Sequence, residues 1–178
     1  MAWTLAALLL LLPLVAMQFT NEVDWDAADF TIFGAMLLIA GAAFEAASRM
    51  SGNKAYRAAV GVALAAAFIL VWMNLAVGII GTEDDPANLM FGGVLAIGLI
   101  GVVISRFRPD GMARALVATA LAQASVGVVA LVIGSGSKES IWPGEPLILT
   151  GAFAALWLVS AWLFRKAARE QIPTAAAP

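Results

Sequence analysis

The chain has 178 residues, of which 62% are hydrophobic and only 12% are charged, and its mean hydropathy is +0.93. Such a composition excludes an ordinary soluble domain, and this length leaves room for one compact membrane domain. Cysteine and histidine are both missing, which excludes disulfides, thiol chemistry, imidazole metal sites and the usual axial ligands of haem. We therefore predict that the protein binds no metal and no other cofactor.

Six transmembrane helices are predicted, in chain order at residues 2–19, 30–50, 56–80, 88–106, 112–134 and 147–165. A helix rises about 1.5 Å per residue, so each stretch can cross a hydrocarbon core about 30 Å thick. The connections are short, so we expect consecutive helices to be antiparallel neighbours. Residues 171–178 contain two prolines and an alanine run, and are predicted to form a flexible tail.

The chain repeats itself with a period of about 57 residues, which is a sign of a repeat architecture. Arg57-Ala-Ala-Val-Gly-Val-Ala-Leu-Ala65 matches Arg114-Ala-Leu-Val-Ala-Thr-Ala-Leu-Ala122 at six of nine positions, and the same shift superposes Arg49 on Arg106. Each repeat holds two helices, so all repeats share one orientation. We predict an all-α integral membrane fold, a single domain over residues 1–170 built from three tandem helical hairpins at approximately 1–50, 51–108 and 109–170, related by a pseudo-threefold axis along the membrane normal.

The loops between the predicted helices alternate in charge. One set is acidic and contains Glu22, Asp24, Asp26, Asp29, Glu83, Asp84, Asp85, Glu139 and Glu145, together with Lys138. The other set is basic and contains Arg49, Lys54, Arg57, Arg106, Arg108, Arg114, Arg165, Lys166 and Arg169. Basic residues stay in the cytoplasm because they translocate poorly. We therefore predict a multi-pass protein of the bacterial inner (plasma) membrane, with both termini cytoplasmic and the acidic loops outside.

The acidic residues also mark the starts of the second, fourth and sixth predicted helices, at Asp29, Asp85-Pro86 and Glu145-Pro146. A carboxylate near the first turn and a proline at the first helical position suit the free N–H groups and the positive end of the helix dipole. No acidic loop has the Asp-x-Asp-x-Asp-Gly spacing that would preorganise calcium ligands. Capping is therefore preferred to a metal site.

Glu45 is the only ionisable residue well inside a predicted span. A carboxylate at such a position is a candidate for proton or cation transfer. The alternative is an ion pair with Arg49, because a glutamate four residues before an arginine is favourably placed on a helix. Both residues are kept as candidate site positions.

Four neutral polar residues also fall within predicted spans, namely Asn74, Gln123, Ser125 and Ser160. Such side chains usually form hydrogen bonds between helices in a membrane, and that is the preferred interpretation. Gln123 is the most central, so it is also the best candidate to line an internal cavity. Asn74 and Gln123 complete the set of candidate site residues.

Small residues recur at spacings of four or seven, which lets helix backbones approach closely; they are Gly34 and Gly41, Ala63 and Ala67, Gly92 and Ala96, Ala118 and Ala122, Gly151 and Ala155. Most tryptophans fall near predicted membrane interfaces, whereas Trp157 is more central and is predicted to contact lipid or a partner. The basic turns can attract anionic lipid head groups, which at this stage we regard as incidental.

The plan of three tandem hairpins resembles that of small uncharacterised bacterial six-helix inner-membrane proteins, and in its layout that of the HdeD-like family, which is linked to acid stress. The segments that carry the resemblance are Pro86-Ala-Asn-Leu-Met-Phe-Gly-Gly93 and Arg106-Phe-Arg-Pro-Asp-Gly-Met-Ala-Arg114. The resemblance implies a stress-related membrane role. The resemblance is limited to the repeat layout, so it assigns no functional residue in this chain.

Two functions remain in view. The first is a non-enzymatic scaffold or accessory subunit whose partners are the lipid bilayer and another membrane protein or a second copy of this chain, with no nucleic acid. The alternative is a small transporter or channel for a proton or small solute along the bundle axis. Transport of a charged solute normally needs buried charges, and Glu45 is the only ionisable residue well inside a predicted span. This scarcity of buried charge favours the scaffold. No catalytic residue is predicted, because the membrane spans hold no nucleophile–base pair.

Overall fold

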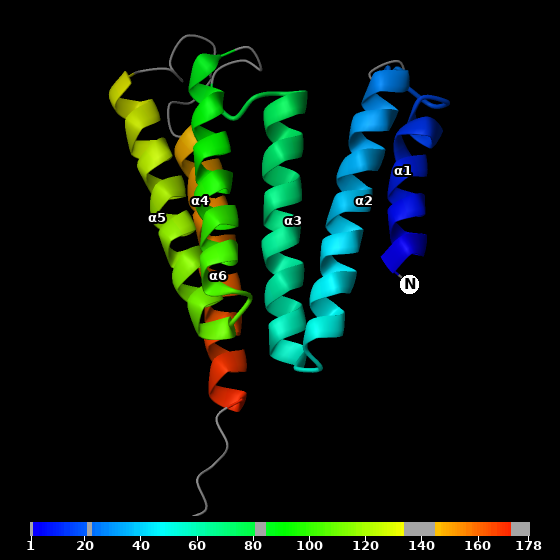
Figure 1. Ribbon diagram of the computed structural model, residues 1–178. Coiled ribbons are helices and arrows are strands. Elements are labelled where there is room, and N and C mark those ends of the chain that lie inside the picture. The colour runs from blue at the N-terminus through cyan, green and yellow to red at the C-terminus, as the bar shows by residue number, and fades with distance from the viewer. Residues whose placement is uncertain (1, 21–22, 81–84, 134–144, 172–178) are drawn as a thin grey trace, which may run out of the picture. The chain divides into compact units, whose positions relative to one another are not determined.

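The computed structural model describes residues 2–20, 23–80, 85–133 and 145–171. These residues form six α-helices and one short 3₁₀ turn, η1 (Figure 1). The bounds are α1 Ala2–Ala16, α2 Ala27–Met50, α3 Lys54–Ala76, η1 Pro86–Asn88, α4 Leu89–Ser105, α5 Pro109–Ile133 and α6 Glu145–Glu170. The all-helical fold predicted from the sequence is confirmed over these ranges.

Five helices, α2 to α6, are long and apolar enough to cross a membrane, which suggests a membrane protein. The first helix is shorter than predicted: α1 has 15 residues, which span about 22 Å at the usual rise. It ends at Ala16 because the chain tightens there, with Gln18 N–H bonded to Val15 O and Phe19 N–H to Ala16 O. Bonds of this i→i+3 type commonly close a helix.

The chain forms two compact units, Met1–Met50 and Ser51–Pro178. In the first unit α1 packs along α2 at two glycines. The Cβ position at Gly34 lies 3.7 Å from Leu10 Cδ1, and that at Gly41 lies 3.2 Å from Trp3 Cζ3. The glycine pair predicted to allow close packing on this helix therefore faces α1.

The start of α2 is held by two carboxylates. Asp26 Oδ1 accepts hydrogen bonds from the N–H groups of Ala28 and Asp29 at 2.7 and 2.9 Å, and Asp29 Oδ2 accepts one from Asp26 N–H at 3.0 Å. The first free N–H groups of the helix are thus satisfied reciprocally. A carboxylate cap is present as predicted, but the capping residue is Asp26 and Asp29 is its partner, because α2 begins at Ala27, three residues before the predicted start. Asp85 caps η1 in the same way, through Ala87 N–H at 2.8 Å.

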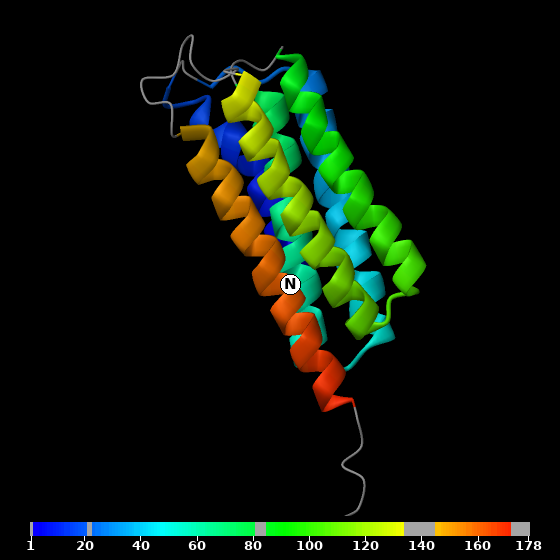
Figure 2. The ribbon, with the colours of Figure 1, turned by 90° about the vertical axis from the view of Figure 1, so that its left-hand side faces the viewer.

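In the second unit α6 packs against both α3 and α5, and α4 packs against α5 (Figure 2). The side-chain contacts explain why α6 rather than α4 is the main neighbour of α3. Ser160 Oγ on α6 donates a hydrogen bond to Ala59 O on α3 at 2.7 Å, and the rings of Tyr56 and Phe164 meet edge to face at 5.2 Å. The structure therefore does not show three equivalent hairpins.

The helix pairs of the second unit approach closely at glycines. A Cβ added to Gly101 of α4 would lie 2.5 Å from Ala115 Cβ of α5, and one added to Gly127 of α5 would lie 2.9 Å from Thr150 Cγ2 of α6. Nothing lies within 4 Å of the Cβ positions of Gly92 and Gly151. The small residues predicted to mediate packing on α4 and α6 were thus the wrong ones, because the buried faces lie elsewhere on these helices.

Side chains also fix the connections of this unit. Asn88 Oδ1 accepts hydrogen bonds from Ile79 and Ile80 N–H at 3.1 and 3.0 Å, and the Asn88 amide donates to Ile80 O. These bonds join the residues just after α3 to the last residue of η1, which directly precedes α4. The α4–α5 turn is left-handed at Arg106 and Phe107, with φ of 49° and 60°. Tyr56 Oη donates to Phe107 O at 3.2 Å, which brings the start of α3 to this turn.

The described lysine and arginine residues of the second unit gather at one end of its helices. The cations lie at the start of α3, in the α4–α5 turn, in the first turns of α5 and in the last turns of α6; they are Lys54, Arg57, Arg106, Arg108, Arg114, Arg165, Lys166 and Arg169. Asn53, which caps α3, donates its amide to Glu170 Oε2 at 2.8 Å and so joins two of these ends. Asp85 stands at the opposite end, before α4.

Candidate functional site

Glu45 of α2 binds two partners within the first unit. Its Oε1 pairs with the Arg49 guanidinium, and its Oε2 accepts a hydrogen bond from the Trp3 indole N–H at 3.1 Å. The side chain of Glu45 is 41% exposed and that of Arg49 is 78% exposed. The predicted ion pair is therefore present. Because Trp3 belongs to α1, the carboxylate also ties α1 to α2, a structural task that the sequence did not reveal.

Gln123 of α5 is fully buried, and neither its Nε2 nor its Oε1 has a hydrogen-bond partner. The interhelical bond that the sequence led us to prefer for this residue is therefore absent. Leaving a buried amide unpaired costs about 1–3 kcal/mol. Most of the buried residues in the described core are apolar.

Trp157 of α6 is the second buried group without a partner. It is only 3% exposed, and its indole Nε1 has no hydrogen-bond acceptor. The prediction that it meets lipid or a partner is wrong, because it lies on the face of α6 that is buried in the bundle, whereas Trp162 on another face is 62% exposed. The contact of Gly127 with Thr150 sets the register of α5 and α6. In that register Trp157 lies about one helical turn beyond Gln123, so these two residues lie at neighbouring levels of the core.

The other polar residues are satisfied mainly within their own helices. Asn74 donates to Leu70 O at 2.9 Å, while its buried Oδ1 has no partner. Ser125 donates to Leu121 O at 2.9 Å on an exposed face. Only Ser160 forms the interhelical bond predicted for all of them. Glu45 and Arg49 are paired within the first unit, and Asn74 and Gln123 belong to the second.

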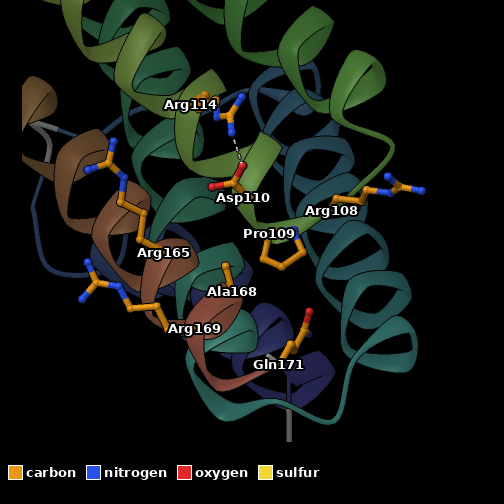
Figure 3. Close-up of a pocket in the computed structure, with 8 residues that line it drawn as sticks. All are labelled: Arg108, Pro109, Asp110, Arg114, Arg165, Ala168, Arg169 and Gln171. Atoms are coloured by element: carbon orange, nitrogen blue, oxygen red, sulfur yellow. Dashed lines mark hydrogen bonds and ion pairs between the residues drawn. The ribbon is translucent and has the colours of Figure 1, made fainter. Parts of the chain in front are cut away.

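A basic pocket of about 670 Å³ lies between the start of α5 and the end of α6 (Figure 3). It is lined by Arg108, Pro109, Asp110, Arg114, Arg165, Ala168, Arg169 and Gln171. Asp110 pairs with Arg114 across one helical turn, as the dashed line in Figure 3 marks. Within the part of the chain that the structure describes, no carboxylate lies within ion-pair distance of Arg108, Arg165 or Arg169.

A second basic pocket of about 320 Å³ adjoins the first. Trp162, Arg165, Lys166 and Arg169 line it, so both pockets share Arg165 and Arg169. Together the two pockets contain five cationic side chains and one carboxylate, which make a net charge of 5 − 1 = +4. The basic turns are visible in the sequence, but only the fold brings two of these segments, about 57 residues apart, together in one pocket.

Over the described residues, no group of three or more histidine, cysteine, aspartate or glutamate side chains could hold a metal ion. The pocket instead offers guanidinium donors, which suit oxyanions such as phosphate. No protein-family model, no curated protein and no solved structure matches this chain. Its function is therefore inferred from the chemistry of its own residues.

Proposed function

We propose that this chain is a multi-pass inner-membrane protein that acts as a non-enzymatic scaffold or accessory subunit. The observation that carries the proposal is the apolar surface that the helices leave uncovered. In α2, only 6% of the most apolar stretch is buried. Each of the other four long helices has its own most apolar stretch, and at most 39% of it is buried. Large side chains such as Leu38, Ile39, Val103 and Ile104 are 60–76% exposed. An apolar surface of this kind requires lipid or another protein to cover it.

The partner we propose is another membrane protein or a second copy of the chain, and the first unit supports this choice. Its longer helix, α2, buries only Phe33, Leu37 and Ala47, so the unit has little core of its own. In lipid, helices associate through close packing rather than through a hydrophobic driving force, so an apolar face becomes a protein contact only where another helix fits it. On the resemblance to HdeD-like proteins, we place the role in the response to stress.

The proposed architecture keeps the three tandem hairpins, with both termini in the cytoplasm and the acidic loops outside. Its support is the collection of described cations at one end of the second unit, because lysine and arginine near membrane spans remain cytoplasmic. The starts of α3 and α5 are close to one repeat period apart, since Lys54 and Pro109 are separated by 109 − 54 = 55 positions.

Cysteine labelling tests the topology directly, because the chain has no cysteine of its own. Ser51→Cys places a thiol between α2 and α3 at the basic end, and Val77→Cys places one at the opposite end of α3. In intact cells a membrane-impermeant maleimide should label Cys at position 77 and spare position 51 until the membrane is opened. Labelling of position 51 in intact cells would overturn the proposed orientation.

Photo-crosslinking tests the scaffold role. A benzophenone side chain at Ile39, which is 69% exposed on α2, should capture a second polypeptide in cells. The same group at Leu70, which is fully buried, is the matched control and should capture none. Mass spectrometry of the adduct then identifies another protein or a second copy. Adducts with lipid alone, at Ile39 and equally at Ile104 on α4, would contradict a scaffold.

A transporter or channel for a proton or small solute is the alternative, and the unpaired amide of Gln123 in the core favours it. If Gln123 lines a path, Gln123→Leu should abolish flux in reconstituted vesicles, and if Glu45 carries protons, Glu45→Gln should do the same. Under the scaffold proposal, vesicles with the unaltered protein show no flux above empty vesicles, and photo-capture at Ile39 is unaffected by either change.

A further inference from the structure

From the two adjoining basic pockets at the end of α5 and α6 we infer a binding site for the phosphate group of an anionic phospholipid. The first support is the charge of the site. Arg165 and Arg169, which belong to both pockets, have no carboxylate within ion-pair distance among the described residues, and the only lining carboxylate is engaged by Arg114. Guanidinium groups bind phosphate oxygens through paired N–H donors, so unengaged arginines around one hollow favour this ligand.

The geometry of the pocket adds to this charge. Figure 3 shows Arg165 and Arg169 projecting from neighbouring turns of α6, with Arg114 on α5 above them and Pro109 at the start of α5 on the opposite side of the pocket. Pro109 occupies the first turn of α5, where free N–H groups and the positive end of the helix dipole also attract an anion. Two helices, α5 and α6, thus contribute to the lining of one basic pocket.

The surface next to the pocket identifies the source of the phosphate as a lipid. On α6 the positions Gly151, Ala155, Leu158, Trp162, Arg165 and Arg169 recur at spacings of three or four, which places them along one helix face. All of these residues are exposed. An uncovered apolar stripe therefore leads through Trp162, a residue type enriched at membrane interfaces, into the arginines. The acyl chain of a lipid can lie along the stripe while its head group enters the pocket. A soluble phosphate has no apolar part that could contact the stripe.

The inference rests on the proposed membrane insertion, which the cysteine labelling tests separately. Its own test uses the full chain purified in a mild neutral detergent and titrated with phosphatidylglycerol or with zwitterionic phosphatidylcholine, with bound lipid counted by native mass spectrometry. Each cation near an anionic lipid strengthens binding by about fivefold. Arg165→Gln with Arg169→Gln should therefore weaken phosphatidylglycerol binding roughly 30-fold and change phosphatidylcholine binding little.

The matched control removes two charges from the same end of the unit but outside both pockets. Lys54→Gln with Arg57→Gln should leave phosphatidylglycerol binding within about twofold of the unaltered protein. Arg165→Lys with Arg169→Lys keeps the charges but removes the paired N–H donors, so its phosphatidylglycerol affinity should fall between that of the unaltered protein and that of the glutamine variant. Circular dichroism and the elution volume of each variant check that the helices remain intact.

Three outcomes would overturn the inference. The first is equal binding of the two lipids by the unaltered protein. The second is equal loss of phosphatidylglycerol from the pocket variant and from the control variant, which would indicate a general effect of charge. The third is release of the lipid by a large excess of inorganic phosphate, which would make the site one for a soluble anion.

Discussion

The contact between α4 and α5 at Gly101 makes the packing of the second unit directly testable. A Cβ at this position would lie 2.5 Å from Ala115 Cβ and 3.3 Å from Ala115 Cα. Carbon atoms in contact normally stay about 3.5–4.0 Å apart, so Gly101→Ala requires the two helices to separate locally by about 1 Å. Neither atom of Ala115 can rotate away, because both are fixed by the backbone.

Overpacking of this kind typically costs about 1–3 kcal/mol. An alanine also favours a helix over a glycine by roughly 0.5–1 kcal/mol, which offsets part of the cost. Gly93→Ala in the same helix is the matched control, since nothing lies within 4 Å of its Cβ position. It gains the same helix preference without the clash. The difference between the two variants therefore isolates the packing term, at about 1–3 kcal/mol.

The assay is equilibrium unfolding of the purified protein in mixed micelles with increasing dodecyl sulfate, followed by circular dichroism. Gly101→Ala should unfold at a lower detergent fraction than the unaltered protein, and Gly93→Ala at the same fraction or a higher one. Equal midpoints for the two variants would refute the close approach of α4 and α5 at this position and, with it, the packing order of the unit.

Three further predictions use the same assay or a simple extension of it. Ser160→Ala should cost about 1 kcal/mol, because it removes the buried bond to Ala59 O, whereas Ser125→Ala should be near neutral; equal effects would contradict the bond between α3 and α6. Gln123→Leu should be neutral or stabilise the protein by up to about 2 kcal/mol, because it removes an unpaired buried amide, and a marked destabilisation would reveal a partner for that amide. Glu45→Ala should loosen α1 from α2 by removing the acceptor for the Trp3 indole, so a cysteine introduced at Leu10 should react faster with a lipid-soluble maleimide; an unchanged rate would show that Glu45 does not hold the pair.

Much of the local structure could be predicted from the sequence because its causes are local. Five of the six predicted helices lie where they were expected, with ends displaced by up to five residues, since a long apolar stretch must satisfy its own backbone hydrogen bonds. Carboxylates at helix starts were predicted for the same reason, and Asp85 caps as predicted, whereas at α2 the capping residue is Asp26 and the predicted Asp29 is its partner. The Glu45–Arg49 pair needed only the four-residue spacing of a helix.

The buried face of each helix could not be predicted from the sequence. Helices that are apolar all round show no amphipathic stripe, so nothing in α6 distinguishes the buried Trp157 from the exposed Trp162. The same difficulty misplaced the packing glycines of α4, where Gly92 was expected to face a neighbour and Gly101 does so. In each case a partner helix decides, and its position depends on side chains far along the chain.

The sequence by itself determined that the chain is helical and apolar, roughly where its helices lie, and that its cations and carboxylates alternate between loops. These properties follow from interactions within a few residues. The tertiary structure alone decided that α6 packs between α3 and α5, that Gln123 is buried without a partner, and that the start of α5 and the end of α6 enclose one basic pocket. The physical reason is that contacts between similar apolar helices are selected by shape and close packing, and these become defined only when the helices meet.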